Sequence, residues 1–120
     1  MIPNNIRNIL DNLQGKRVLV AGDLILDHYL EGVVDRISPE APVPIVSLES
    51  SEGQWVPGGA ANVARNISSL GGIPVMAGIA GEDREGSLLE QLLRKESIDT
   101  AALVSDPSRP TTSKTRIMSD

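Results

Sequence analysis

The sequence predicts an α/β fold in which a mostly parallel sheet is flanked by helices and carries a small β-flap. Two apolar runs, Val18–Ala21 and Ile73–Ala80, are typical of strands that are buried on both faces. Segments with a helical repeat of apolar residues lie before and after these runs. Strands that alternate with helices favour right-handed crossovers and hence a parallel sheet.

Three segments are predicted to be helices that each bury one apolar face. The apolar positions are Ile6, Ile9, Leu10 and Leu13 in the first, Ala60, Val63, Ala64, Ile67 and Leu70 in the second, and Leu88, Leu89, Leu92 and Leu93 in the third. Asp83 is placed to cap the third helix, and Gly71 follows the end of the second.

The β-flap is predicted from residues 29–56, with a further strand at 111–118. Three short β-like stretches occur in the first segment, near Tyr29–Val34, Val43–Leu48 and Gln54–Val56. Pro39, Pro42 and Pro44 separate the first two stretches, and because proline lacks an N–H group, the second stretch is expected at a sheet edge or a strand start.

The composition excludes several classes of protein. With 40% apolar residues, 22% charged residues and a net charge of −5 in 120 residues, the chain is predicted to be globular and not disordered. The absence of cysteine argues against disulfides and a thiolate metal site, and the single histidine makes a zinc centre improbable. An acidic chain with two aromatic residues is a poor nucleic-acid binder. No apolar run is long enough to span a membrane and no signal peptide is evident, so we expect a cytoplasmic protein.

Asp23 and Asp27 follow the first predicted buried strand. In parallel sheets, ligands bind beyond the carboxyl ends of the strands. Carboxylates there accept hydrogen bonds from vicinal hydroxyl groups, so the pair suits a sugar or another polyol. The alternative interpretation is structural, with Asp27 in a turn and Asp23 capping one.

Gly58 and Gly59 precede the second predicted helix, and Asn62 lies in its first turn. Two glycines allow a ligand to approach the backbone closely at a helix N-terminus. Asn62 lies off the apolar face and offers both a donor and an acceptor. The spacing matches neither a P-loop nor a dinucleotide-binding fingerprint, and a simple strand-to-helix turn is the alternative.

Basic residues mark two further candidate positions. Arg36 lies beside the β-flap, where it faces either an anionic substrate or an ion-pair partner. Thr112, Lys114 and Arg116 share one face of the last predicted strand. That face suits a phosphate group, and a solvated strand surface is the alternative.

Taken together and in this order, these strings resemble the N-terminal part of the ribokinase-like carbohydrate kinases. Within that family the chain is most similar to the heptose-phosphate kinases of ADP-heptose synthesis. The diagnostic strings are RISPEAPVP at residues 36–44 and PGGAANVA at residues 57–64. Residues 22–27 and 111–117 support the resemblance, which covers about residues 15–118.

The resemblance implies a kinase that transfers the γ-phosphate of ATP, with Mg²⁺, to O1 of D-glycero-D-manno-heptose 7-phosphate for the lipopolysaccharide core. It also implies a ribokinase-like fold whose β-lid, here residues 29–56 and 111–118, pairs with a second subunit in a homodimer. The family's sugar-binding aspartate corresponds to Asp27, which Asp23 assists, and its Gly-Gly and Asn correspond to Gly58, Gly59 and Asn62. Only two residues separate the glycine pair from Asn62, whereas many members have three.

The family's catalytic base lies in a DTxGAGD motif, and the sequence contains no such string. We therefore expect residues 1–120 to be the N-terminal part of a kinase domain, without its nucleotide-binding part, its catalytic residue or activity of its own. An adenylyltransferase follows the kinase in many relatives. Two alternatives are a kinase for another sugar or sugar acid, and a non-catalytic β-lid module for dimerisation. The alternative to a dimer is a monomer whose N-terminal helix covers the sheet edge.

Overall fold

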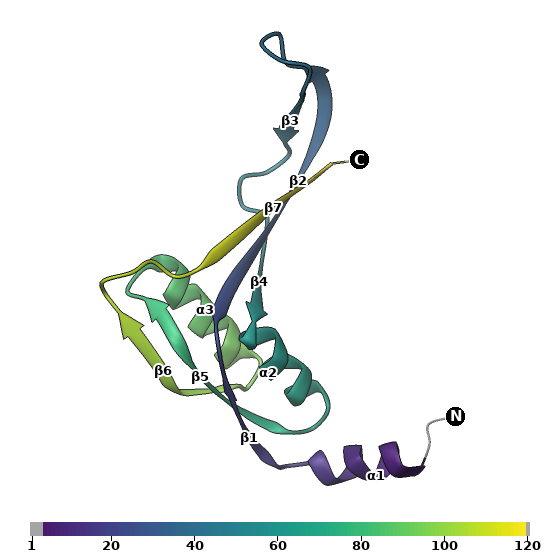
Figure 1. Cartoon of the computed structure of the whole chain (residues 1–120), viewed down its shortest axis with the longest axis vertical. Coiled ribbons are helices and arrows are strands. Elements are labelled where there is room, and N and C mark those ends of the chain that lie inside the picture. The colour runs from purple at the N-terminus through teal and green to yellow at the C-terminus, as the bar shows by residue number, and fades with distance from the viewer. Residues whose placement is uncertain (1–3, 120) are drawn as a thin grey trace.

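The computed structural model describes residues 4–119, which form two sheets that project in different directions (Figure 1). The first sheet contains β1 (Arg17–Ala21), β5 (Ile73–Gly81) and β6 (Asp99–Asp106) in the order β1-β5-β6. All its pairings are parallel, as the alternation of strands and helices predicts. The carboxyl ends of its strands therefore lie along one edge, beside the start of the second sheet.

Helices α2 (Ala60–Ser69) and α3 (Arg84–Lys95) cover one face of this parallel sheet (Figure 1). We call this sheet with its two helices the body. Helix α1 (Asn4–Leu13) extends away from the body. None of the helices in residues 4–119 combines the length and the apolar character that a membrane span needs.

The core lies between the parallel sheet and the two helices. Its largest fully buried side chains include Leu26, Met76, Leu89 and Leu93. Burying a side chain of this size stabilises the fold by about 1.5–3 kcal/mol. Leu26 belongs to the second sheet, so the core also attaches that sheet to the body.

The second sheet, called the lid sheet below, is organised around one long strand. That strand is β2 (Leu24–Ile37), which pairs with all three others: antiparallel to β3 (Pro44–Leu48) and β4 (Gln54–Gly59), and parallel to β7 (Ser113–Ser119). Residues 26–29 pair with both β4 and β7, so these two strands lie on opposite edges of β2. Strand β3 starts at Pro44 and pairs with β2, in agreement with the predicted edge position.

The two faces of β2 have different environments. Leu24, Leu26, His28 and Leu30 are buried, whereas the alternate residues Ile25, Asp27 and Tyr29 lie on the other, more open face. His28 stacks on Trp55 of β4 with ring centroids 3.7 Å apart, and its Nε2 lies 3.0 Å from the Glu52 carbonyl oxygen. This packing fixes which face of β2 is available to a ligand.

Predictions of helix ends are confirmed at two positions. The Asp83 carboxylate accepts a hydrogen bond of 2.8 Å from the Gly86 N–H group and so caps α3. Gly71 follows α2 with a φ of 87°, a left-handed conformation that favours glycine at this position.

Predictions of burial are wrong at several positions. Strand β1 is not buried on both faces, because Leu19 is 66% exposed, and Ile79 of β5 is also exposed. These residues lie on the face of the parallel sheet opposite α2 and α3. In α2 the fully buried residues are Ala61 and Ala64, whereas Val63, and Leu70 just after the helix, are exposed. The predicted apolar face of α1 is likewise open at Ile6 and Ile9.

Candidate functional site

Asp27 lies in the middle of the lid sheet, on the open face of β2. Its Oδ1 accepts a hydrogen bond of 2.5 Å from Nη1 of Arg116, which is 89 residues away in the sequence and belongs to β7. The Asp27 side chain is 15% exposed and that of Arg116 is 37% exposed. The alternative interpretation of Asp27 as a turn residue is wrong, because Leu24–Ile37 is one continuous strand.

Tyr29 completes the surroundings of the Arg116 guanidinium group. The Tyr29 hydroxyl lies 3.2 Å from Nη1, and the guanidinium carbon lies 5.1 Å from the centroid of the Tyr29 ring. An arginine over an aromatic face gains a cation–π attraction. Arg116 is therefore held from two sides, and it in turn holds the Asp27 carboxylate in one orientation.

The two glycines of the PGGAANVA string have different structural roles. Gly58 is buried in β4, and a Cβ atom there would overlap the Asp27 carboxylate. Gly59 precedes α2 with a φ of 58°, and a Cβ atom there would lie 2.5 Å from the Asp23 carbonyl oxygen. Gly58 thus makes room for the carboxylate, and Gly59 allows the turn from strand to helix.

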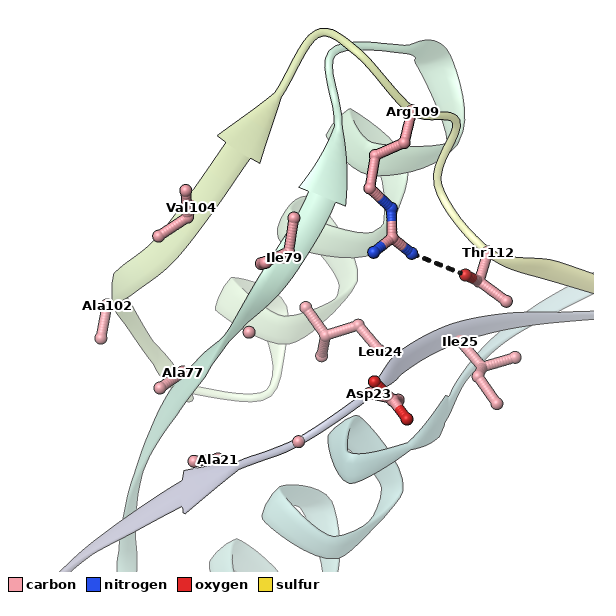
Figure 2. A pocket seen from close by; sticks show the side chains of 12 residues that line it. Ala21, Asp23, Leu24, Ile25, Ala77, Ile79, Ala102, Val104, Arg109 and Thr112 are labelled. Carbon is pink, nitrogen blue, oxygen red and sulfur yellow. Dashed lines mark hydrogen bonds between the residues drawn. The ribbon is translucent and has the colours of Figure 1, made fainter.

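Asp23 lies at a cavity of about 670 Å³ where the lid sheet joins the body (Figure 2). Ala77, Ile79, Ala102 and Val104 form the apolar wall of this cavity on the face opposite the helices. The Arg109 guanidinium group extends into it and donates a hydrogen bond of 3.3 Å to Thr112 Oγ1. Ile25, which lies on the same face of β2 as Asp27, is also part of the lining. The lining therefore reaches β2 two residues before Asp27.

Asn62 lies in the first turn of α2 and is exposed. Among residues 4–119 its amide makes no side-chain hydrogen bond with the protein, in keeping with a group that is available to a ligand.

The basic candidates separate into two groups. Lys114 is the register partner of Asp27, and Arg116 is the register partner of Tyr29. Both therefore lie on the open face of the lid sheet, as their spacing predicts. Arg36 pairs with Ile45 near the far end of β2, nine residues from Asp27. At about 3.3 Å per residue that separation is about 30 Å, so within one chain Arg36 does not join the site.

Two residues at the site, Tyr29 and Arg109, are not predicted from the sequence. The sequence around Tyr29 predicts only that it lies in a strand. Its contact with Arg116 joins residues that are 87 positions apart in the sequence. Arg109 lies in the segment between β6 and β7, where no periodic pattern predicts its direction. Neither contact has a local sequence signal.

The arrangement offers hydroxyl-binding groups beside cationic groups. Asp27 retains an oxygen that Arg116 does not bind, and carboxylate oxygens are strong acceptors for hydroxyl donors. Lys114 and Arg116 add positive charge on the same face. A polyol that also carries an anionic group fits this chemistry.

Comparison with known proteins agrees with this description. Residues 16–120 match the pfkB family of carbohydrate kinases. The chain is 47% identical over 115 residues to the bifunctional protein HldE of Hyphomonas neptunium, which covers 96% of this chain and 23% of that protein. It is 50% identical over 103 residues to the bifunctional protein HldE of Rhodopseudomonas palustris, covering 86% and 21%. The chain thus spans about a quarter of the length of these curated relatives.

Solved structures confirm the ribokinase-like α/β fold. A carbohydrate kinase from Agrobacterium tumefaciens superposes with a TM-score of 0.67 and 25% identity, covering 87% of this chain and 32% of that one. A fructokinase from Vibrio cholerae, in a form with bound fructose, ADP and calcium ion, gives a TM-score of 0.60 and 27% identity over 83% of this chain and 27% of that one. By fold and by sequence, the chain belongs to the pfkB family of carbohydrate kinases.

Proposed function

We propose that this chain contributes the sugar-binding part of a kinase that phosphorylates O1 of D-glycero-D-manno-heptose 7-phosphate with ATP, a step toward ADP-heptose and the lipopolysaccharide core. The observation that carries the sugar-binding role is the oriented Asp27 carboxylate, packed against Gly58 and held by Arg116. The heptose assignment is supported by the strings at residues 36–44 and 57–64 and by the identity to the HldE proteins.

In this proposal each residue of the site has a distinct task. Asp27 and Asn62 hydrogen-bond sugar hydroxyl groups, with Asp23 at the adjoining cavity. Gly58 makes room for the Asp27 carboxylate, Gly59 allows the turn into α2, and Lys114 and Arg116 favour the negative charge of the 7-phosphate. Phosphoryl transfer depends mainly on positioning and on charge stabilisation. The role of these residues is therefore to hold the accepting hydroxyl group in place.

The nucleotide and Mg²⁺ are requirements of the complete kinase in this proposal. Among residues 4–119, no group of three or more histidine or acidic side chains is placed to hold a metal ion. We assign no step on the nucleotide to residues 4–119.

The test is a substrate comparison with the complete product of the gene that encodes this chain. ADP release is measured with ATP and either heptose 7-phosphate, fructose or ribose. We expect kcat/KM to be highest for heptose 7-phosphate, and a preference for fructose or ribose would contradict the substrate assignment. The same assay on residues 1–120 tests the expectation that this chain has no kinase activity alone, and heptose-dependent ADP release that is lost in Asp27→Ala would refute it.

The main alternative is a kinase of this family for a different sugar. It is favoured by the similarity to the Vibrio cholerae fructokinase at 27% identity. The same three-sugar comparison separates it from the heptose kinase.

A further inference from the structure

The end of the body and the beginning of β7 are joined by a compact set of hydrogen bonds. Asp83 Oδ1 accepts from the Gly86 N–H group at 2.8 Å and from the Thr111 hydroxyl at 2.6 Å. Asp83 Oδ2 accepts from the Thr111 N–H group at 2.7 Å. Thr111 Oγ1 also accepts from the Gly81 N–H group at 2.8 Å. One carboxylate thus caps α3 and binds Thr111, two residues before the last strand of the lid sheet.

Close packing leaves Thr111 little freedom at this joint. Thr111 is 6% exposed. A Cβ atom on Gly81 would lie 2.6 Å from the Thr111 nitrogen, and one on Gly86 would lie 2.9 Å from Thr111 Oγ1. The backbone of the body therefore approaches Thr111 as closely as glycine permits.

The joint is connected directly to the candidate site. The carbonyl oxygen of Thr112 accepts a hydrogen bond of 2.9 Å from the Leu26 N–H group. From there β7 runs parallel to β2, with Leu26 opposite Ser113 and Tyr29 opposite Arg116. The position at which β7 begins therefore determines where Arg116 meets Asp27.

We propose that Asp83 and Thr111 are positioning residues for the sugar site. They fix the start of β7 on the body, so that Arg116 reaches Asp27 and orients its carboxylate. The alternative is that this joint only caps α3. The part of the proposal that concerns ligand affinity rests on the proposed function, whereas the part that concerns β7 does not.

The first test measures hydrogen exchange by mass spectrometry in the complete gene product, without ligand. Thr111→Val keeps the shape of the side chain but removes the hydroxyl group, and Thr111→Ser retains that group. In Thr111→Val we expect exchange of peptides from β7 to be about tenfold faster, with β1 and β5 unchanged and with Thr111→Ser close to wild type. Unchanged exchange in β7, or equal acceleration in β1, would overturn the proposal.

The second test measures binding of heptose 7-phosphate to the same proteins by calorimetry. In Thr111→Val, sugar binding must restore the position of β7, and we expect binding to be weaker by up to the free energy of the lost hydrogen bond, about tenfold, with the KM for ATP unchanged and recovery in Thr111→Ser. The control is Arg65→Gln, which breaks the 2.7 Å ion pair between α2 and Glu96 at the other end of α3. It should lower thermal stability without weakening sugar binding.

The outcomes separate this inference from the proposed function. Unchanged affinity in Thr111→Val, or equal weakening in Arg65→Gln, would show that the joint is merely structural. If wild type binds fructose or ribose instead, the heptose assignment is wrong and the comparison is made with the sugar that binds. If none of the three sugars binds, the exchange experiment decides alone.

Discussion

Asp27 is the residue on which the sugar-binding proposal depends most directly. Its carboxylate is oriented by Arg116 and faces the open side of the lid sheet. Asp27→Ala removes a charged hydrogen-bond partner, which predicts a loss of sugar affinity of roughly ten- to a hundredfold. Calorimetry with the complete gene product measures this, and Asp35→Ala, farther along the same strand, is the control. Equal affinity in Asp27→Ala and Asp35→Ala would remove Asp27 from the site.

Asn62→Ala is expected to weaken sugar binding more than ATP binding, because the amide is exposed at the start of α2 and makes no structural hydrogen bond in residues 4–119. The loss should be about tenfold, and the thermal transition should be unchanged. Separate titrations with sugar and with ATP make the comparison. Equal weakening of both ligands would indicate a general effect and not a sugar contact.

Substitution of Gly58 tests whether sugar binding depends on the position of the Asp27 carboxylate. A Cβ atom at this position would overlap the Asp27 carboxylate, which must then move away from Arg116. We expect Gly58→Ala to weaken sugar binding at least tenfold even though no ligand-binding side chain is removed. Combining it with Asp27→Ala should add little further loss, since both changes act on the same carboxylate. Additive losses would contradict this explanation.

At the scale of elements, the cap of α3 makes stability depend on pH. The Thr111 hydroxyl, followed by the N–H groups of Thr111 and Gly86, lowers the pKa of Asp83 below its usual 3.8. A lowered pKa in the folded state means that the ionised carboxylate stabilises the fold above the unfolded pKa. This contribution is lost as the pH falls through the lower folded pKa.

The corresponding variant is Asp83→Asn, which cannot ionise. We expect its deficit in free energy of unfolding to be present at about pH 5 and to shrink as the pH falls below the unfolded pKa and through the lowered folded pKa of Asp83. Urea unfolding at a series of pH values measures the difference. A deficit that does not change with pH would mean that the charge of Asp83 does not stabilise the fold.

Structural features that depend on residues close together in the sequence could be predicted from it. The Asp83 cap, the glycine after α2 and the edge position of β3 depend on residues within a few positions of each other, and all three are confirmed. The contact between Asp27 and Arg116 could not be derived in this way, because β7 must first pair with β2 across 89 residues. Similarly, the periodicity of α2 could not show that Ala61 faces the core.

At the scale of the whole molecule, apolar surface remains open on both sheets. Ile37, at the far end of the lid sheet, is 62% exposed, and Val33 and Val43 are also exposed. The predicted alternative of a monomer covered by α1 finds no support, because α1 extends away from the body (Figure 1). Exposed apolar surface of this kind favours association.

We therefore expect a dimer through residues 29–56 and 111–118. Light scattering from micromolar to submillimolar concentration should give twice the monomer mass. Ile37→Asp should shift the equilibrium toward monomer. Ile9→Asp, at an equally exposed position on α1, should not. A single monomeric mass over this range, or equal effects of the two substitutions, would contradict a lid-mediated dimer.

Strand β2 places Leu26 and Asp27 side by side in the sequence but on opposite faces of the sheet. A slip of one residue against β4 or β7 would exchange these environments, taking a carboxylate into the core and leaving a leucine in solvent. The cost of an unpaired buried charge makes such a misaligned molecule unstable. A molecule in which β2 has slipped is therefore too unstable to remain folded. Molecules in the native state consequently carry Asp27 on the open face of the lid sheet.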